Sequence, residues 1–263
     1  MAARSDQAAG MVPTPTPTPL QECYVISLRP VGAHGMMRRA AAARGMRVLA
    51  LSPWRIEARD DAATRKALRA ALAADAVVFT SPPAVRAAAA LQPLRPRRGQ
   101  SWLAVGGGTA AALRRAGVQD VGAPTRMDSE GLLALPALRG IRGQRIGLVT
   151  APGGRGALAP ALGQRGATVV RANVYERVSI APSPRAAAFL QSSHATPWLA
   201  LSSGEALRHV LSALPTAAAT ALRRARVVAA SARLADLARG LGFRDVRIAV
   251  DARPGSLVDA IAE

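Results

Sequence analysis

Residues 76–85 read AVVFTSPPAV, and residues 198–207 read WLALSSGEAL. Each stretch is a short apolar run, followed by two hydroxyl residues and the start of a helical pattern. A buried strand that runs into a helix through such a turn is typical of an open α/β sheet. The two turns are 122 residues apart in a chain of 263 residues. The chain therefore repeats one strand-to-helix turn about half its length later.

Other segments recur at nearly the same offset. RGMRVLALSPW (44–54) is similar to RGATVVRANVY (165–175) at an offset of 121, and GVQDV (117–121) to GFRDV (242–246) at 125. Similar segments in the same order at a nearly constant offset indicate an internal duplication. We therefore expect two similar lobes, from copies near 24–140 and 145–263, with a cleft between them.

Short apolar runs alternate with helical patterns along the whole chain. Continuous apolar strands of this kind are typical of parallel sheets that are covered on both faces. The sequence therefore predicts an α/β protein with right-handed crossovers. The expected strands lie at 24–28, 47–51, 76–80, 102–106, 145–150, 168–175, 198–202, 225–231 and 246–250.

The charge is strongly basic, with a formal net charge of +19. Lys66 is the only lysine, so the excess is almost entirely arginine in an alanine-rich chain, which is typical of a compositional bias. With three Trp, two Tyr and three Phe, the arginines are not interleaved with aromatic residues. An anionic small molecule accounts for the charge at least as well as nucleic acid, which we do not expect as a partner.

Several observations favour a cytoplasmic protein. No apolar run approaches the roughly 20 residues that a membrane span needs. Residues 1–21 contain PTPTPTP and no apolar segment typical of a secretion signal, so we expect a disordered leader there. Cys23 is the single cysteine, which excludes an intrachain disulfide. No apolar surface suggests a partner subunit, so we expect a monomer.

Small hydroxyl residues follow several of the expected strands. Backbone N–H groups at a helix N-terminus, with the helix dipole, favour anions at this edge of a parallel sheet. Glycines at 106–108 and 153–154 would let a ligand approach the backbone, and Arg155 would add a cation. The candidate ligand-binding residues are Thr80, Ser81, Gly106, Thr109, Ser129, Arg155, Ser202, Ser203 and Ser231.

Each of these features also has a plainer interpretation. A serine at a helix start is most often only a cap. The three histidines lack metal-ligand spacing, so we expect no metal site and place them on the surface or on helix faces. Tyr175, whose counterpart in the first copy is Trp54, either packs at a lobe junction or turns its phenol toward the cleft.

Taken in order, these residues resemble the uroporphyrinogen-III synthase family over residues 24–263. The resemblance is carried by the order and spacing of short motifs rather than by any single one. The motifs are LRP, VVFTSPPAV, AVGGGTAAALRRAG, SEGLL, APGGRGALAPALGQRGA, NVYERV, ALSSGEAL and AASARLADLARGLGF.

The resemblance implies a domain arrangement that the repeat alone does not indicate. One α/β lobe would consist of residues 22–53 plus 177–263, and the other of residues 57–172. A two-stranded connector near 53–56 and 173–176 would join them.

The resemblance also implies an activity. Enzymes of this family are lyases that close hydroxymethylbilane, a linear tetrapyrrole with an acetate and a propionate on each ring, to uroporphyrinogen III. Water is lost, ring D is inverted, and neither cofactor nor metal is needed. Tyr175 matches the tyrosine of the family's VY motif and would be the catalytic proton donor, while the hydroxyl residues would bind carboxylates.

The chain departs from the family pattern at one position. Pro83 stands where some relatives have an arginine two residues after the serine of the TSP motif. Arg86 or Arg155 would then meet the carboxylate, and Arg29 matches an arginine in the early RP motif. A two-lobed protein that binds an anionic small molecule without catalysis is the alternative function.

Overall fold

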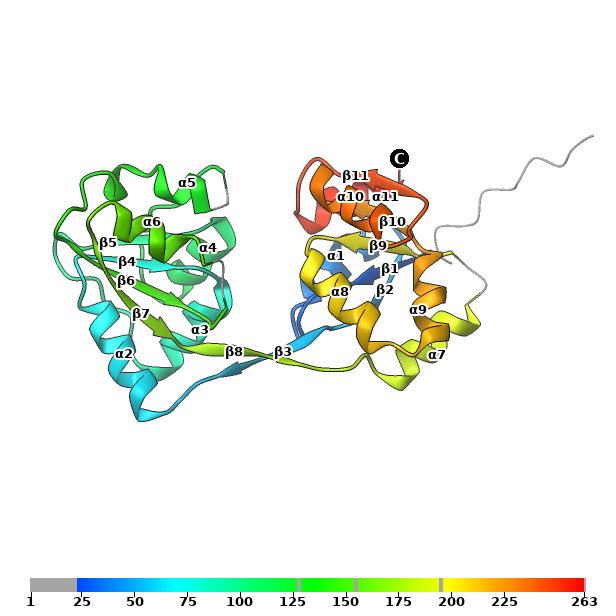
Figure 1. Cartoon of the computed structure of the whole chain (residues 1–263), viewed down its shortest axis with the longest axis horizontal. Helices are drawn as coiled ribbons and strands as arrows, with labels where there is room; N and C mark the ends of the chain where they lie inside the picture. Colours follow the sequence, from blue (N-terminus) through cyan, green and yellow to red (C-terminus); the bar gives the residue numbers. More distant parts are fainter. Residues whose placement is uncertain (1–22, 127–128, 154–155, 194–195, 263) are drawn as a thin grey trace, which may run out of the picture. The chain divides into compact units, whose positions relative to one another are not determined.

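The computed structural model describes residues 23–126, 129–153, 156–193 and 196–262 (Figure 1). The chain divides into two compact units. Unit 1 combines Met1–Pro53 with Ile180–Glu263, and unit 2 is Trp54–Ser179. The leader expected at 1–21 lies outside the described residues.

In the described part of unit 1, five parallel strands form one sheet in the order β11-β10-β9-β1-β2. The central strand β9 is buried along its whole length, as a strand covered on both faces must be. The strands are β1 (Tyr24–Ser27), β2 (Arg47–Ala50), β9 (Trp198–Leu201), β10 (Arg226–Ala229) and β11 (Val246–Ile248).

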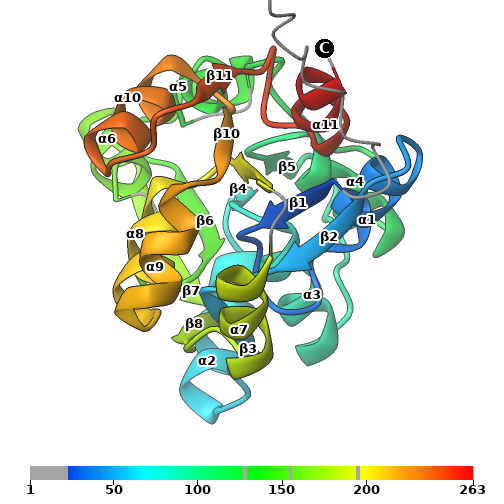
Figure 2. The same cartoon turned by 90° about the vertical axis from the view of Figure 1, so that its right-hand side faces the viewer.

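Helices cover both faces of this sheet. Figure 2 shows α1 and α11 on one side, and α8 and α9 on the other. The α1 and α11 side buries Met37 and Leu257 against Val25 of β1 and Val228 of β10. The helices of unit 1 are α1 (Gly35–Ala42), α7 (Pro184–Ser192), α8 (Gly204–Ala213), α9 (Thr216–Arg223), α10 (Ala232–Gly240) and α11 (Pro254–Ala262).

Unit 2 is built in the same way, with a parallel sheet in the order β5-β4-β6-β7. Its strands are β4 (Ala76–Phe79), β5 (Ser101–Ala104), β6 (Arg145–Thr150) and β7 (Thr168–Asn173). Its helical segments are α2 (Ala62–Leu72), α3 (Pro82–Leu91), α4 (Gly107–Arg115), α5 (Ser129–Leu133), the short 3₁₀ helix η2 (Pro136–Leu138) and α6 (Leu158–Gln164).

The side chains of β4 alternate between two separate cores. Val77 and Phe79 belong to the core beneath α2, α3 and α4, whereas Ala76 and Val78 belong to the core beneath α5 and α6. Successive residues of a strand point to opposite faces, so an apolar run without interruption supplies both cores. The expected α/β class with two parallel sheets is therefore confirmed.

Gly147 of β6 permits an unusually close approach between a helix and the sheet. A Cβ atom at this position would lie 2.0 Å from the carbonyl oxygen of Ala71 in α2. Any side chain would push α2 away from the strand, so only glycine permits this packing.

A two-stranded antiparallel ribbon accompanies both passages of the chain between the units. β3 (Trp54–Ala58) pairs with β8 (Tyr175–Ser179), with Trp54 opposite Ser179 and Ala58 opposite Tyr175. The chain leaves unit 1 at Pro53 and returns at Ile180, whose N–H donates to the carbonyl oxygen of Pro53. The two-stranded connector is thus present as β3 and β8.

Helix α9 was not expected from the sequence. It buries Ala218, Ala219 and Leu222, and it packs against α7 and α8. Two of its three buried side chains are alanine. No helix in the described ranges is long and apolar enough to cross a membrane.

Candidate functional site

The turn after β4 presents two hydroxyl groups at the carboxyl edge of the unit 2 sheet. Ser81 caps α3, because its Oγ accepts a hydrogen bond of 3.2 Å from the backbone N–H of Ala84. Pro82 occupies the first helical position, where its missing N–H costs no hydrogen bond.

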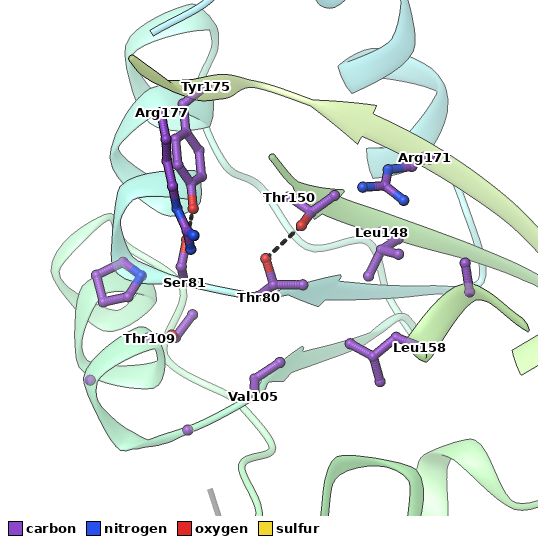
Figure 3. Close-up of a pocket in the computed structure, with 14 residues that line it drawn as sticks. Thr80, Ser81, Val105, Thr109, Leu148, Thr150, Leu158, Arg171, Tyr175 and Arg177 are labelled. Carbon is purple, nitrogen blue, oxygen red and sulfur yellow. Dashed lines mark hydrogen bonds between the residues drawn. The ribbon is translucent and has the colours of Figure 1, made fainter. Parts of the chain in front are cut away.

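Tyr175, the first residue of β8, reaches this turn from a distant part of the chain. Its ring packs in the core beneath α2, α3 and α4, and the residue is only 3% exposed. Its hydroxyl oxygen lies 3.0 Å from Oγ of Ser81 (Figure 3). The ring therefore packs within unit 2, while the phenol oxygen reaches the turn after β4.

A second pair of hydroxyl groups lies beside the first. Thr80 Oγ1 donates a hydrogen bond of 2.9 Å to Oγ1 of Thr150, the last residue of β6. Thr150 is 4% exposed, so its hydroxyl is held within the sheet edge rather than free in solvent. Because β4 and β6 are paired neighbours, their carboxyl ends place these threonines together.

The start of α4 forms another wall of the same site. Gly106 is the N-cap and provides no side-chain hydrogen bond, while the buried Thr109 lies in the first turn. The first N–H groups of a helix have no intrahelical acceptor, and the helix dipole makes this end positive. The turn from β5 to α4 is therefore suited to a carboxylate.

These groups line one cavity of about 400 Å³, which we call the Tyr175 cavity (Figure 3). Arg171 of β7 and Arg177 of β8 contribute the cations, and the guanidinium of Arg177 also lies 5.1 Å from the ring centroid of Trp54. None of the described lining residues is an aspartate or a glutamate. The lining consists of Thr80, Ser81, Pro82, Val105, Gly106, Gly108, Thr109, Leu148, Thr150, Leu158, Ala159, Arg171, Tyr175 and Arg177.

The cavity combines an apolar floor with positive charge and hydroxyl donors. Leu148, Leu158 and Val105 supply apolar surface for an organic ring, while the arginines and helix N-termini favour carboxylates. The hydroxyl of Tyr175 is an O–H donor that a reaction in this cavity could use. The arrangement suits an aromatic polyanion.

The structure brings together five of the ten residues singled out in the sequence, namely Thr80, Ser81, Gly106, Thr109 and Tyr175. Ser129 is the first residue of α5. Arg155 lies outside the described residues. Arg86, considered as a replacement for the arginine missing at Pro83, is exposed on α3 and does not line the cavity.

The remaining candidates lie in unit 1. Ser203 and Ser231 cap α8 and α10, and their Oγ atoms accept hydrogen bonds from Ala206 and Leu234. Ser202 is exposed beside Ser203, at the carboxyl end of β9. Because β9 pairs with β10, these turns share one edge of the unit 1 sheet.

His34 corrects an expectation, because it is buried rather than on the surface. It is 3% exposed, and its ring nitrogens lie 2.9 Å from Ser27 Oγ and 2.9 Å from Ser52 Oγ. Burial, with the positive charges of Arg38 and Arg29, lowers the pKa of His34 to about 4. The ring is therefore neutral at pH 7 and links the ends of β1 and β2.

Arg29 lies close to this histidine and is itself partly buried. Burial lowers the pKa of its guanidinium from the usual value, and its buried Nε has no hydrogen-bond partner in the described part of the chain. A partly desolvated cation of this kind is stabilised by an anionic ligand.

Three polar lining residues were not singled out in the sequence, namely Thr150, Arg171 and Arg177. Thr150 ends an expected strand, and Arg177 follows Tyr175 within the NVYERV motif. The position of each residue in the sequence could therefore have marked it as a candidate for the site. Arg171 interrupts the apolar run TVVRAN, and a charged residue inside a strand marks a position that contacts solvent or a ligand.

Comparisons with known proteins identify the family of this chain. The family model described as uroporphyrinogen-III synthase HemD matches residues 36–259. The uroporphyrinogen-III synthase of Salmonella typhimurium is 34% identical over 173 residues, which span 63% of this chain and 70% of that protein. The enzyme of the same name from Escherichia coli is 33% identical over 162 residues, or 61% and 66% of the two chains.

Solved structures share the fold. A mutant uroporphyrinogen III synthase from Thermus thermophilus aligns with a TM-score of 0.58 at 22% identity, over 91% of this chain and 97% of that one. The uroporphyrinogen-III synthetase of Helicobacter pylori gives 0.60 at 12% identity, over 91% and 98%. The match of the family model over most of the sequence establishes that this chain belongs to the uroporphyrinogen-III synthase family of haem-biosynthesis enzymes.

Proposed function

We propose that the chain converts hydroxymethylbilane to uroporphyrinogen III, and that the Tyr175 cavity of unit 2 binds the reacting part of the substrate. The observation that carries this proposal is the contact of 3.0 Å between the Tyr175 hydroxyl and Ser81 at the rim of a cationic cavity. A substrate with two carboxylates on each pyrrole ring matches a cavity that combines apolar surface, arginines and helix N-termini.

Tyr175 is proposed as the general acid. Hydroxymethylbilane must lose its terminal hydroxyl as water, which leaves an electrophilic azafulvene. The phenol donates its proton, or a strong hydrogen bond, to that departing oxygen, and a group of this kind typically contributes about 10²–10⁴-fold to the rate. Ser81 orients the phenol through the hydrogen bond between the two hydroxyl groups.

The protein must also orient the substrate for ring closure. The azafulvene closes without help to the uninverted isomer, so the protein must hold ring D where its substituted carbon attacks. A spiro intermediate then fragments and recloses. Holding reacting groups in a productive geometry can by itself supply several kcal/mol of rate acceleration. We propose that Thr80, Gly106 and Thr109 hold carboxylates for this purpose.

Unit 1 is proposed to bind further carboxylates. Ser203 and Ser231 stand at the N-termini of α8 and α10, and Ser202 is exposed next to them. Ser129 at the start of α5 and Arg155 are retained as proposed contacts from the sequence. The proposed reaction uses neither cofactor nor metal. We also propose that the chain acts as a cytoplasmic monomer, without nucleic acid as a partner.

A coupled assay tests the reaction. Hydroxymethylbilane is generated in situ, the protein is added, and the oxidised products are separated into isomers I and III by chromatography. Isomer III as the main product supports the synthase. Isomer I alone, from protein shown to be folded by circular dichroism, contradicts it and favours an anion-binding protein without catalysis.

A further inference from the structure

Arg171 lies in the Tyr175 cavity but has no role in the chemistry described above. It extends from β7, and Figure 3 places its guanidinium on the side of the cavity away from Tyr175 and Ser81. Leu148, its register partner on β6, lies beside it in the lining. The cavity therefore has the phenol of Tyr175 and the side chain of Arg177 at one end, and the guanidinium of Arg171 at the other.

The guanidinium of Arg171 is held in place by two neutral acceptors. Its Nε donates to Oδ1 of Asn173 at 2.9 Å, and its Nη2 donates to the carbonyl oxygen of Ala151 at 2.8 Å. No carboxylate in the described part of the chain pairs with Arg171. The guanidinium is thus held in one orientation, and it has no carboxylate counterion among the described residues.

The guanidinium of Arg171 is preorganised to bind a carboxylate. A guanidinium has five N–H groups, so three remain after the two hydrogen bonds to Asn173 and Ala151. Parallel N–H groups of one guanidinium match the two oxygens of a carboxylate. Because the side chain is already ordered, little further conformational entropy is lost when a ligand binds.

We propose that Arg171 anchors one carboxylate of the substrate and so decides which pyrrole ring faces Tyr175. This inference rests on the proposed function. An anchor opposite the phenol restricts the tetrapyrrole to one placement, in which ring D reaches the azafulvene through its substituted carbon. Without the anchor, the azafulvene closes from other placements and isomer I accumulates.

The test compares Arg171→Gln with Arg115→Gln as the matched control. Arg115 is also exposed in unit 2 and donates to a backbone carbonyl, that of Ala111, but it does not line the cavity. We expect Arg171→Gln to raise KM at least tenfold and to lower the fraction of isomer III. Arg115→Gln should leave both values as in the wild type.

Two further variants separate charge from orientation. Arg171→Lys keeps the charge without the paired N–H groups, so KM should recover more than the isomer fraction does. Asn173→Ala keeps the arginine but removes one hydrogen bond that orients it, so the isomer fraction should fall while KM changes less. If Arg171→Gln does not fold, KM and the isomer fraction of Arg171→Lys are compared with those of the wild type instead.

Direct binding distinguishes failure of this inference from failure of the proposed function. Uroporphyrin III, a stable octacarboxylate, is titrated against each variant, and its fluorescence is followed. Affinity about tenfold weaker for Arg171→Gln, and unchanged for Arg115→Gln, supports the anchor even if the wild type forms only isomer I. Equal affinity of wild type and Arg171→Gln, or an unchanged isomer fraction in an active wild-type background, overturns the inference.

Discussion

The hydroxyl oxygen of Tyr175 lies 3.0 Å from Oγ of Ser81, and the same Oγ accepts the backbone N–H of Ala84. The Ser81 hydroxyl accepts the helix-cap hydrogen bond with one lone pair and still has its own proton, which it can donate to the phenol oxygen. The Tyr175 proton is then available to a substrate in the cavity. One cap residue thus both starts a helix and orients the proposed acid.

Replacing Tyr175 by Phe tests the acid directly. The ring and its packing are retained, and only the proton donor is lost. We expect kcat to fall about 10²-fold or more, with KM changed by less than the rate. The measurement is the initial rate of isomer III formation in the coupled assay. Wild-type kcat in Tyr175→Phe would exclude the phenol as the acid.

Replacing Ser81 by Ala separates its two roles when Ser183→Ala is the control. Ser183 caps α7 with the same contact of 3.2 Å, to the N–H of Ala186, but lies outside the Tyr175 cavity. Each variant should lose about 1 kcal/mol of stability in urea unfolding. We expect only Ser81→Ala to lower kcat as well. An equal effect of both variants on kcat would show that Ser81 is merely a cap.

His34 makes unit 1 sensitive to acid. The pKa of His34 is about 4 in the folded chain and near 6.5 when unfolded, so protons bind preferentially to the unfolded state between these values. Its contribution to stability is complete above pH 6.5 and is lost as the pH falls toward 4. Between pH 7 and pH 5, the free energy of unfolding should fall by at most about 2 kcal/mol because of His34.

The variant His34→Gln keeps hydrogen-bonding groups near Ser27 and Ser52 but cannot titrate. Urea unfolding at pH 7 and pH 5, followed by circular dichroism, should show a smaller acid-induced loss of stability in this variant than in the wild type. An identical loss in both proteins would assign the acid sensitivity to other groups.

Gly147→Ala and Gly163→Ala are expected to change stability in opposite directions. The added methyl group at Gly147 meets the carbonyl oxygen of Ala71, so α2 must shift and stability should fall by about 1–3 kcal/mol. Gly163 lies in α6 with no atom within 4 Å of an added Cβ, so alanine should stabilise by about 0.5–1 kcal/mol. Thermal unfolding of both variants measures this, and a loss of similar size at both positions would contradict the packing argument.

The expected strands agree well with the structure, because strands buried on both faces must be apolar throughout. The run AVVF forms β4 and RIGLVT forms β6, each as written in the sequence. The sequence also predicted the capping serines. Ser81, Ser203 and Ser231 each follow an apolar run and precede a helical pattern. Helix α9 and the burial of His34 were not predicted, and the burial of an isolated histidine depends on the residues that pack around it.

The order of residues was enough to predict the α/β class, the strand ends proposed to bind a ligand and the family resemblance, because these depend on local patterns. The contact between Tyr175 and Ser81, 94 residues apart, and the fixed guanidinium of Arg171 depend instead on strand order, register and packing. These relations arise from many weak contacts across the whole sheet. No local stretch encodes them, and they exist only once the chain has folded.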